Sequence, residues 1–212
     1  MLIATLLAVQ GPYYLAFTPG EVLKYSETFD VTETVGARKL SAQVTREQTV
    51  IVKRWDRNRA TLEIKYSEPR ARGTSANSAN FAGEVRSWVD RADGEAFVDQ
   101  RGIMSREGFP SGSRSFFGFN VPGHRDKLPS EWKTKLLPPM GMDKAIEFVY
   151  SQANANGRIG VAFRGAAKDK DVQIECDGTT WFESGKISSA RMRGKVTDSD
   201  GIVEFDYSAT RN

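Results

Sequence analysis

Cysteine and histidine are almost absent from this chain of 212 residues, which contains one of each, Cys176 and His124. A single cysteine allows neither an intramolecular disulfide nor a cysteine-based zinc site. A catalytic triad, a cysteine–histidine pair or a multi-histidine metal site would have to use the one histidine. The composition therefore argues against the familiar hydrolase and metalloenzyme sites, and we expect no metal, no cofactor and no catalysis.

An excess of charge of one sign is also missing. The chain has 30 Lys and Arg against 27 Asp and Glu, a formal net charge of +3, and the two signs are interspersed. Nucleic-acid-binding proteins more typically concentrate positive charge in one patch. Arg70–Gly73, and Arg114 beside Phe116, could combine charge with stacking on bases. The near balance of charge nevertheless predicts no nucleic-acid partner.

Long hydrophobic runs are limited to Met1–Gln10, which is too short to span a membrane as a helix. This run resembles the apolar region of a secretory signal peptide, although no basic residue precedes it and the cleavage pattern is poor. The alternative is a buried first strand that continues into Leu15. We predict a signal peptide or apolar N-terminal segment over 1–17, one domain over 18–212, no transmembrane segment in the mature chain, and a secreted or periplasmic location.

Helical spacing over three turns is missing too, whereas alternation of apolar and polar residues recurs along the chain. In Thr45–Tyr66 two β-rich runs flank the turn Asp56–Arg59. Four residues after the turn share one face: Ala60, Leu62, Ile64 and Tyr66. Period 2 is typical of a strand with one face on a core and the other in water.

The same pattern continues between turn signals at 36, 91–94, 154–157, 183–185 and 198–201, and residues 177–178 are expected to turn or bulge the chain. Phe81–Val89 is predicted to be a strand that forms a hairpin across Arg91–Gly94, and Pro69–Asn80 a loop. The predicted fold is all-β, a highly curved antiparallel sheet or incomplete β-barrel. Two related halves, Lys24–Arg101 and Lys133–Val196, are a further interpretation.

Three segments carry a resemblance to known proteins: Val22–Tyr25, the hairpin Arg54–Thr61 and Leu128–Trp132. With the long successive strands, they resemble bacterial envelope half-barrel proteins of the lipoprotein-carrier superfamily type, and uncharacterised secreted bacterial proteins of that general kind. The resemblance implies a curved sheet that holds acyl chains in an apolar groove. It is a likeness of pattern and transfers no functional residue.

The segment 102–139 is the least regular part of the chain and is predicted to be a long irregular loop. Its centre carries Phe116, Phe117 and Phe119, which is too apolar for plain disorder. These rings either plug the core of the domain or form a lid over a ligand groove, with Trp132 nearby. The four aromatic residues are our candidates for ligand binding.

The other polar candidates have simpler explanations. His124 could act as a base oriented by Asp126, but a histidine in a surface loop beside a turn is the favoured explanation. Cys176 alternates with apolar residues, as a small core residue does. A paired-acid site could use Glu175, Asp177 and Glu183, but strand alternation explains these residues. A calcium loop could use Asp198 and Asp200, but a tight turn explains this pair.

Together these observations favour a non-catalytic secreted or periplasmic binding module, with a hydrophobic or amphipathic small molecule held in the concave face of the sheet. The alternative is a structural or protein-interaction domain of the cell envelope, with an envelope protein as partner and a filled core. A cavity above about 300 Å³ with aromatic and aliphatic walls would favour the binding module.

Overall fold

The computed structural model describes residues 14–89, 93–106, 114–122, 128–138 and 145–212. Residues 1–13 of the expected signal peptide and His124 lie outside the described residues. Within the described residues, thirteen strands and one helix follow each other along the chain. They are β1 (Val22–Val35), β2 (Arg38–Asp56), β3 (Arg59–Tyr66), β4 (Arg70–Gly73), α1 (Ala79–Val89), β5 (Gly94–Asp99), β6 (Ile103–Arg106), β7 (Arg114–Ser115), β8 (Glu131–Leu136), β9 (Ile146–Ala155), β10 (Arg158–Asp169), β11 (Val172–Glu183), β12 (Lys186–Thr197) and β13 (Ile202–Arg211).

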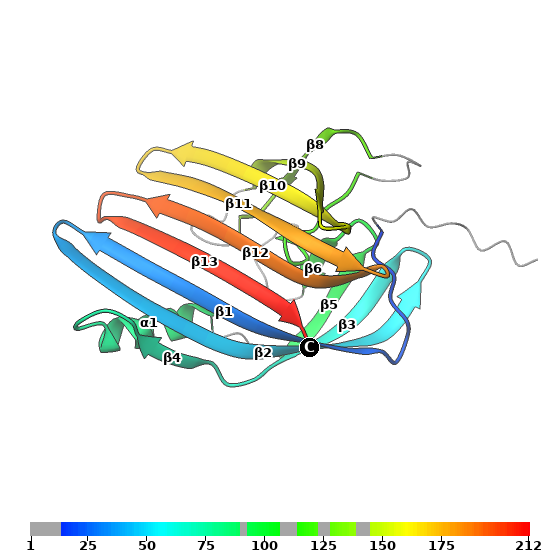
Figure 1. Ribbon diagram of the computed structural model, residues 1–212, viewed down its shortest axis with the longest axis horizontal. Coiled ribbons are helices and arrows are strands. Elements are labelled where there is room, and N and C mark those ends of the chain that lie inside the picture. Colours follow the sequence, from blue (N-terminus) through cyan, green and yellow to red (C-terminus); the bar gives the residue numbers. More distant parts are fainter. Residues whose placement is uncertain (1–13, 90–92, 107–113, 123–127, 139–144) are drawn as a thin grey trace, which may run out of the picture.

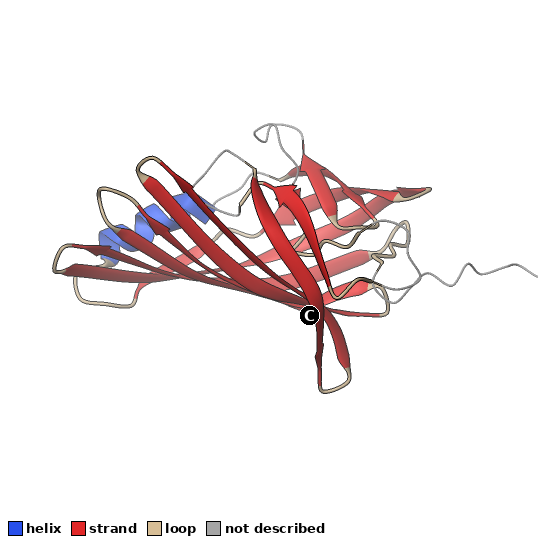
Figure 2. Ribbon diagram, turned by 90° about the horizontal axis from the view of Figure 1, so that it is seen from above, coloured by secondary structure: helices blue, strands red, loops and turns tan. Residues whose placement is uncertain are grey.

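All the described strands belong to one antiparallel sheet in the order β7-β6-β5-β3-β2-β1-β13-β12-β11-β10-β9-β8, with β4 paired to β2 beside this path. The sheet curls until it is nearly closed into a barrel with one open seam, between the β7 and β8 ends of the order. Figures 1 and 2 show the long strands β1, β2 and β10–β13 bending around the interior. The predicted all-β fold, a curved antiparallel sheet in the form of an incomplete barrel, is confirmed.

Alternation decides which residues enter the barrel. The register of β2 against β3 pairs Val50 with Ile64 and Val52 with Leu62, and all four side chains are buried. The neighbouring Lys65 points to solvent, with its side chain about half exposed. The hairpin predicted around residues 56–59 is therefore present in the predicted register.

The segment Phe81–Val89 is a helix and not the predicted strand. The spacing explains the error, because apolar residues recur every four positions, at Phe81, Val85 and Val89. This spacing is compatible both with the period of 2 of a strand and with the period of 3.6 of a helix. Ala82 distinguishes the helix from the strand. It is buried together with Phe81, whereas in a strand two consecutive side chains would point to opposite faces. The helix packs against β2 and β4, and its buried residues are Phe81, Ala82, Val85 and Val89.

Three smaller expectations also change. The element before β5 is the helix α1, so the expected hairpin with Phe81–Val89 is not formed, and β5 pairs with β3. The expected loop Pro69–Asn80 contains β4, and the expected irregular segment 102–139 contains β6, β7 and β8. Gly178, expected to turn or bulge the chain, lies in regular register inside β11, opposite Phe163 on β10 and Met192 on β12.

One end of the barrel is closed by the N-terminal segment. The amide of Leu15 donates to the carbonyl of Gln100 (3.1 Å), and the amide of Ala16 donates to that of Gly185 (2.9 Å), so this segment bridges two sides of the barrel. Leu15 and Phe17 are buried beneath it, which makes residues 14–17 part of the folded domain.

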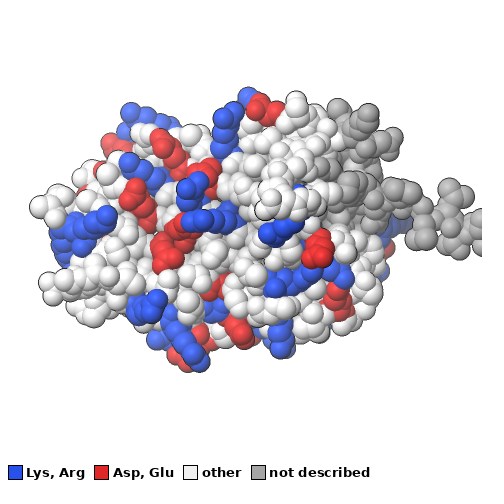
Figure 3. Space-filling view, viewed as in Figure 1, with Lys and Arg blue, Asp and Glu red and all other residues white. Residues whose placement is uncertain are grey.

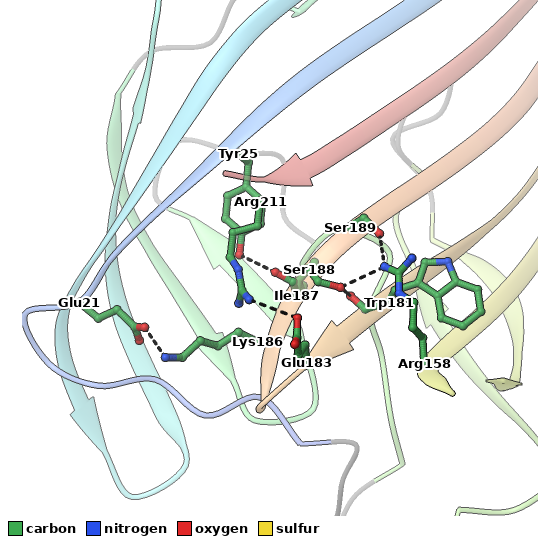
Figure 4. Close-up of polar contacts among 10 residues, drawn as sticks. All are labelled: Glu21, Tyr25, Arg158, Trp181, Glu183, Lys186, Ile187, Ser188, Ser189 and Arg211. Atoms are coloured by element: carbon green, nitrogen blue, oxygen red, sulfur yellow. Dashed lines mark hydrogen bonds and ion pairs between the residues drawn. The ribbon is translucent and has the colours of Figure 1, made fainter. Parts of the chain in front are cut away.

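Polar contacts fix the same end (Figure 4). Glu21 pairs with Lys186 at the start of β12, and the hydroxyl of Tyr25 donates to the carbonyl of Ile187 (3.3 Å). Arg211, in the last strand, lies 3.9 Å from Glu183. These contacts join the first and last strands to the β11–β12 turn.

Candidate functional site: a cavity on the concave face

A cavity of about 370 Å³ lies on the concave face of the sheet, above the closed end. Its aromatic lining comes from strands on both sides of the barrel and from α1: Phe29, Tyr66, Trp88, Phe116, Phe117, Phe148, Phe163, Phe205 and Tyr207. Its aliphatic and sulfur-containing lining completes the apolar wall: Ile64, Val89, Met104, Leu137 and Met192. Five polar residues also line it: Glu27, Arg46, Gln48, Arg114 and Ser115.

Three phenylalanine–glycine pairs make room for the cavity. Each pairs a phenylalanine directly with a glycine on the neighbouring strand: Phe148 with Gly165, Phe163 with Gly178, and Phe205 with Gly194. A Cβ at these glycines would lie 2.7, 2.6 and 2.3 Å from the partner ring, so the rings lie against the bare backbone. Aromatic rings can cover strand glycines in this way. The flat rings leave the barrel interior open where larger side chains would fill it.

The aromatic turn at residues 116–119 forms another wall of the cavity. The amide of Phe119 donates to the carbonyl of Phe116 (2.9 Å), and Phe117 and Gly118 have φ of +52° and +74°. A bulky residue with positive φ is a rare and strained conformation. The turn is held because the amide of Phe116 donates to Gly102 (2.8 Å) and the hydroxyl of Thr180 donates to the carbonyl of Phe117.

The structure separates the four candidate aromatic residues. Phe116 and Phe117 are buried and line the cavity, and the ring of Phe117 lies 4.6 Å from that of Tyr25. Phe119 is fully buried and packs edge-on against Phe182, away from the cavity. Trp132 is buried and stacks on Tyr150, at a centroid distance of 5.9 Å, and does not line the cavity. Two of the four therefore lie where a ligand could contact them.

A buried polar cluster in the cavity wall was not predicted. Glu27 and Arg46 are directly paired across β1 and β2, and Nε of Arg46 donates to Oε2 of Glu27 at 2.5 Å. The hydroxyl of Tyr207 donates to Oε1 of the same carboxylate at 2.7 Å. The sequence does contain a signal, because Glu27 and Arg46 occupy positions where the alternation calls for apolar residues. Gln48, two residues after Arg46, lies on the same face.

The end of α1 borders the cavity. Nη1 of Arg46 donates to the carbonyl of Val89, the last residue of the helix, where a cation is favoured by the helix dipole. Trp88 also lines the cavity and is 42% exposed, an unusual position for so large an apolar side chain.

Burial changes the acidity of several groups in and below the cavity. It raises the pKa of three buried tyrosine hydroxyls above the ordinary value: Tyr25, Tyr150 and Tyr207. For Tyr207 the charge of Glu27 adds to the effect of burial. Burial also raises the pKa of the Cys176 thiol to about 12, so this cysteine is a protonated core residue and a poor nucleophile.

The acidic residues considered in the sequence do not converge. Glu175, Asp177 and Glu183 lie at exposed positions along β11, where Asp177 pairs with Arg193. Asp198 closes a turn, since its Oδ1 accepts hydrogen bonds from the amides of Asp200 and Gly201. Among the described residues, no group of three or more His, Cys, Asp or Glu side chains could hold a metal ion.

Charges on the face shown in Figure 3 alternate in sign over the outer side of the long strands. Among the described residues, oppositely charged side chains pair across neighbouring strands, for example Arg191 with Asp206 (2.5 Å) and Lys133 with Glu147 (2.9 Å). No helix within the described ranges has the length and apolarity needed to cross a membrane.

Comparison with known proteins gives a likeness of fold. No family model and no curated protein matches the chain. Among solved structures, lipovitellin, in a study of its lipid–protein interactions, is similar with a TM-score of 0.52 and 12% identity. The match covers 92% of this chain and 25% of the lipovitellin chain, so this chain spans about a quarter of that protein. The likeness is one of fold, and it agrees with the curved antiparallel sheet expected from the sequence.

Proposed function

We propose that the protein binds a small apolar or amphipathic molecule in the cavity on its concave face, without catalysing a reaction. The observation that carries the proposal is the cavity of about 370 Å³ with its mainly aromatic and aliphatic lining. Small-molecule sites typically enclose about 300–1,000 Å³, are mostly apolar, and contain a few polar groups that orient the ligand. This cavity has all three properties.

Two further observations support binding. Soluble monomers rarely leave large apolar surfaces in contact with water, and a ligand would cover the walls of this cavity. The similar fold of lipovitellin, a protein studied for its lipid interactions, favours a ligand with a hydrocarbon chain. The alternative of a structural envelope domain requires a filled interior, which the cavity does not favour.

The proposal includes a secreted or periplasmic location, which rests on the apolar run Met1–Gln10 and the lack of paired cysteines. An envelope protein that supplies or receives the ligand would be a natural partner. Because Leu15 and Phe17 belong to the core, cleavage is expected before Leu15. N-terminal sequencing of protein from its natural host would show this, whereas cytosolic protein with an intact Met1 would contradict it.

The binding proposal is tested by filling the cavity from one strand. Met192 lines the cavity, and the next residue, Arg193, lies on the outer face and pairs with Asp177. Met192→Trp should occupy part of the cavity, while Arg193→Trp adds the same side chain outside it. Binding is followed by titration with N-phenylnaphthylamine, a neutral dye that fluoresces in apolar surroundings.

We expect saturable binding by the wild type with one dye per chain. Met192→Trp should weaken it at least about tenfold, which corresponds to the loss of about two buried methylene groups. Arg193→Trp should bind as the wild type does. Circular dichroism establishes that both variants are folded. Absence of saturable binding in the wild type, or equal binding by two folded variants, would favour the structural alternative.

A further inference from the structure

Three polar residues occupy inward positions on the strands that line the cavity. Along β2 the inward positions run Val44, Arg46, Gln48 and Val50, and Glu27 takes an inward position on β1. Glu27, Arg46 and Gln48 are all buried, and all line the cavity. A buried ion pair is weak evidence for a role in stability, because apolar residues of similar volume often serve as well. Their place in an apolar cavity points instead to recognition.

The ion pair is fixed from several sides. Both carboxylate oxygens of Glu27 accept a hydrogen bond, one from Tyr207 and one from Arg46. The guanidinium carbon of Arg46 lies 4.1 Å from the ring centroid of Tyr66 and 5.2 Å from that of Phe29. Nε and Nη1 of Arg46 are used by Glu27 and by the end of α1. The cluster is therefore held in one arrangement before any ligand arrives.

Two hydrogen-bonding groups of this cluster are left over. Within the described part of the chain, Nη2 of Arg46 donates to no residue, and the side-chain amide of Gln48 makes no hydrogen bond. Gln48 is 5% exposed, and neither group belongs to the fully buried side-chain atoms of the described residues that lack a partner, so both can be reached from the cavity that they line. A polar atom of a bound ligand can bond to them there in place of water.

The charge of the cluster restricts the chemistry of that atom. Glu27 already neutralises the Arg46 guanidinium at 2.5 Å. A ligand carboxylate on the same guanidinium would place two negative charges close together in surroundings of low dielectric, where like charges repel strongly. A neutral carbonyl accepts the same hydrogen bonds without this repulsion. The N–H group of an amide ligand can also donate a hydrogen bond to the side-chain oxygen of Gln48.

We propose that the ligand is an uncharged amphiphile, an ester or amide of a long alkyl chain, whose carbonyl group is bound inside the cavity by Gln48 and Arg46. This inference rests on the proposed function, since the alkyl chain lies against the apolar wall. The polar end of the ligand is then buried beside β2, while the chain extends along the rings of Phe163 and Phe205.

The test compares ligands with one alkyl chain and different polar ends. Lauramide, methyl laurate and laurate are each used to displace N-phenylnaphthylamine at neutral pH. The wild type is compared with Gln48→Leu, which removes the amide at similar volume. Thr49→Val is the matched control, because Thr49 is the next residue on β2 and points to the other face.

We expect lauramide and methyl laurate to bind the wild type at least about tenfold more tightly than ionised laurate. Gln48→Leu should weaken lauramide about five- to tenfold relative to the dye, the effect of one lost hydrogen bond that only lauramide makes. Thr49→Val should change neither.

Tighter binding of laurate than of lauramide would overturn the inference while leaving the proposed function intact. Equal weakening of dye and lauramide by Gln48→Leu would also overturn it, since the residue would then only shape the cavity. Failure of the wild type to bind even the dye would instead reject the proposed function. If Gln48→Leu does not fold, the affinities of the wild type for lauramide, methyl laurate and laurate decide whether the ligand is uncharged.

Discussion

A methyl group added at Gly194, behind the ring of Phe205, should reduce the volume of the cavity that this ring lines. The Cβ of Gly194→Ala would lie 2.3 Å from Cε1 and Cζ of Phe205, against about 3.5 Å for a relaxed carbon contact. The ring must therefore retreat by about 1.2 Å, and the space beside it is the cavity. Overpacking of this kind costs about 1–3 kcal/mol of folding free energy. Loss of room for one or two methylene groups of ligand, at about 0.8 kcal/mol each, would weaken binding about 4- to 15-fold.

Gly160→Ala is the matched control for this change. Its Cβ would lie 2.7 Å from the ring of Trp181 and 2.8 Å from the carbonyl oxygen of Thr180, a clash that does not involve a ring of the cavity. Urea unfolding should show a comparable loss of stability in both variants, but titration with N-phenylnaphthylamine should show weaker binding only in Gly194→Ala. Equal affinity of the two variants would refute the reasoning that the phenylalanine–glycine pairs create the site.

Three other predictions concern the core and the polar cluster. Ile64→Ala should lower the free energy of unfolding by about 2–5 kcal/mol, and Lys65→Ala by no more than about 0.5 kcal/mol; equal urea midpoints would contradict the strand register. Glu27→Gln leaves the guanidinium of Arg46 buried without a counter-ion and should cost about 3–5 kcal/mol, more than the double change Glu27→Leu with Arg46→Leu. A double variant less stable than the single one would contradict this. The raised pKa of each of the three buried tyrosines favours the protonated hydroxyl in the folded state, so stability is complete below pH of about 10. Above that pH the unfolded chain loses these protons first, and stability should fall by up to about 1.4 kcal/mol per pH unit for each group. Urea midpoints that stay constant between about pH 9 and 11 would contradict the burial of these hydroxyls.

Alternation was sufficient to predict the long strands because every inward residue there meets the same core. The hairpin that ends at Tyr66 is the clearest case, since Ile64 and Lys65 differ in burial as period 2 requires. Alternation does not identify the structure of Phe81–Val89, because apolar residues four positions apart fit the period of a strand as well as that of a helix. The pair Asp177–Gly178 predicts a turn or a bulge, because local signals do not reveal that the ring of Phe163 from β10 lies against Gly178.

The candidate site was predictable only in part. Phe116 and Phe117 were found because three aromatic residues in a glycine-rich segment are conspicuous. The polar cluster was missed although Glu27 and Arg46 interrupt apolar positions of two strands, because only the register brings them opposite each other. The cavity itself depends on contacts between distant strands, such as Gly194 with Phe205, which no local pattern indicates.

The central claim is that the cavity on the concave face holds one ligand molecule. Native mass spectrometry of protein purified from its own source measures this directly, because it gives the mass and number of retained ligands for each chain. The account predicts one small amphiphile per chain, lost on Met192→Trp and kept on Arg193→Trp. A bare polypeptide mass, unchanged after incubation of the protein with lauramide or N-phenylnaphthylamine, would contradict it.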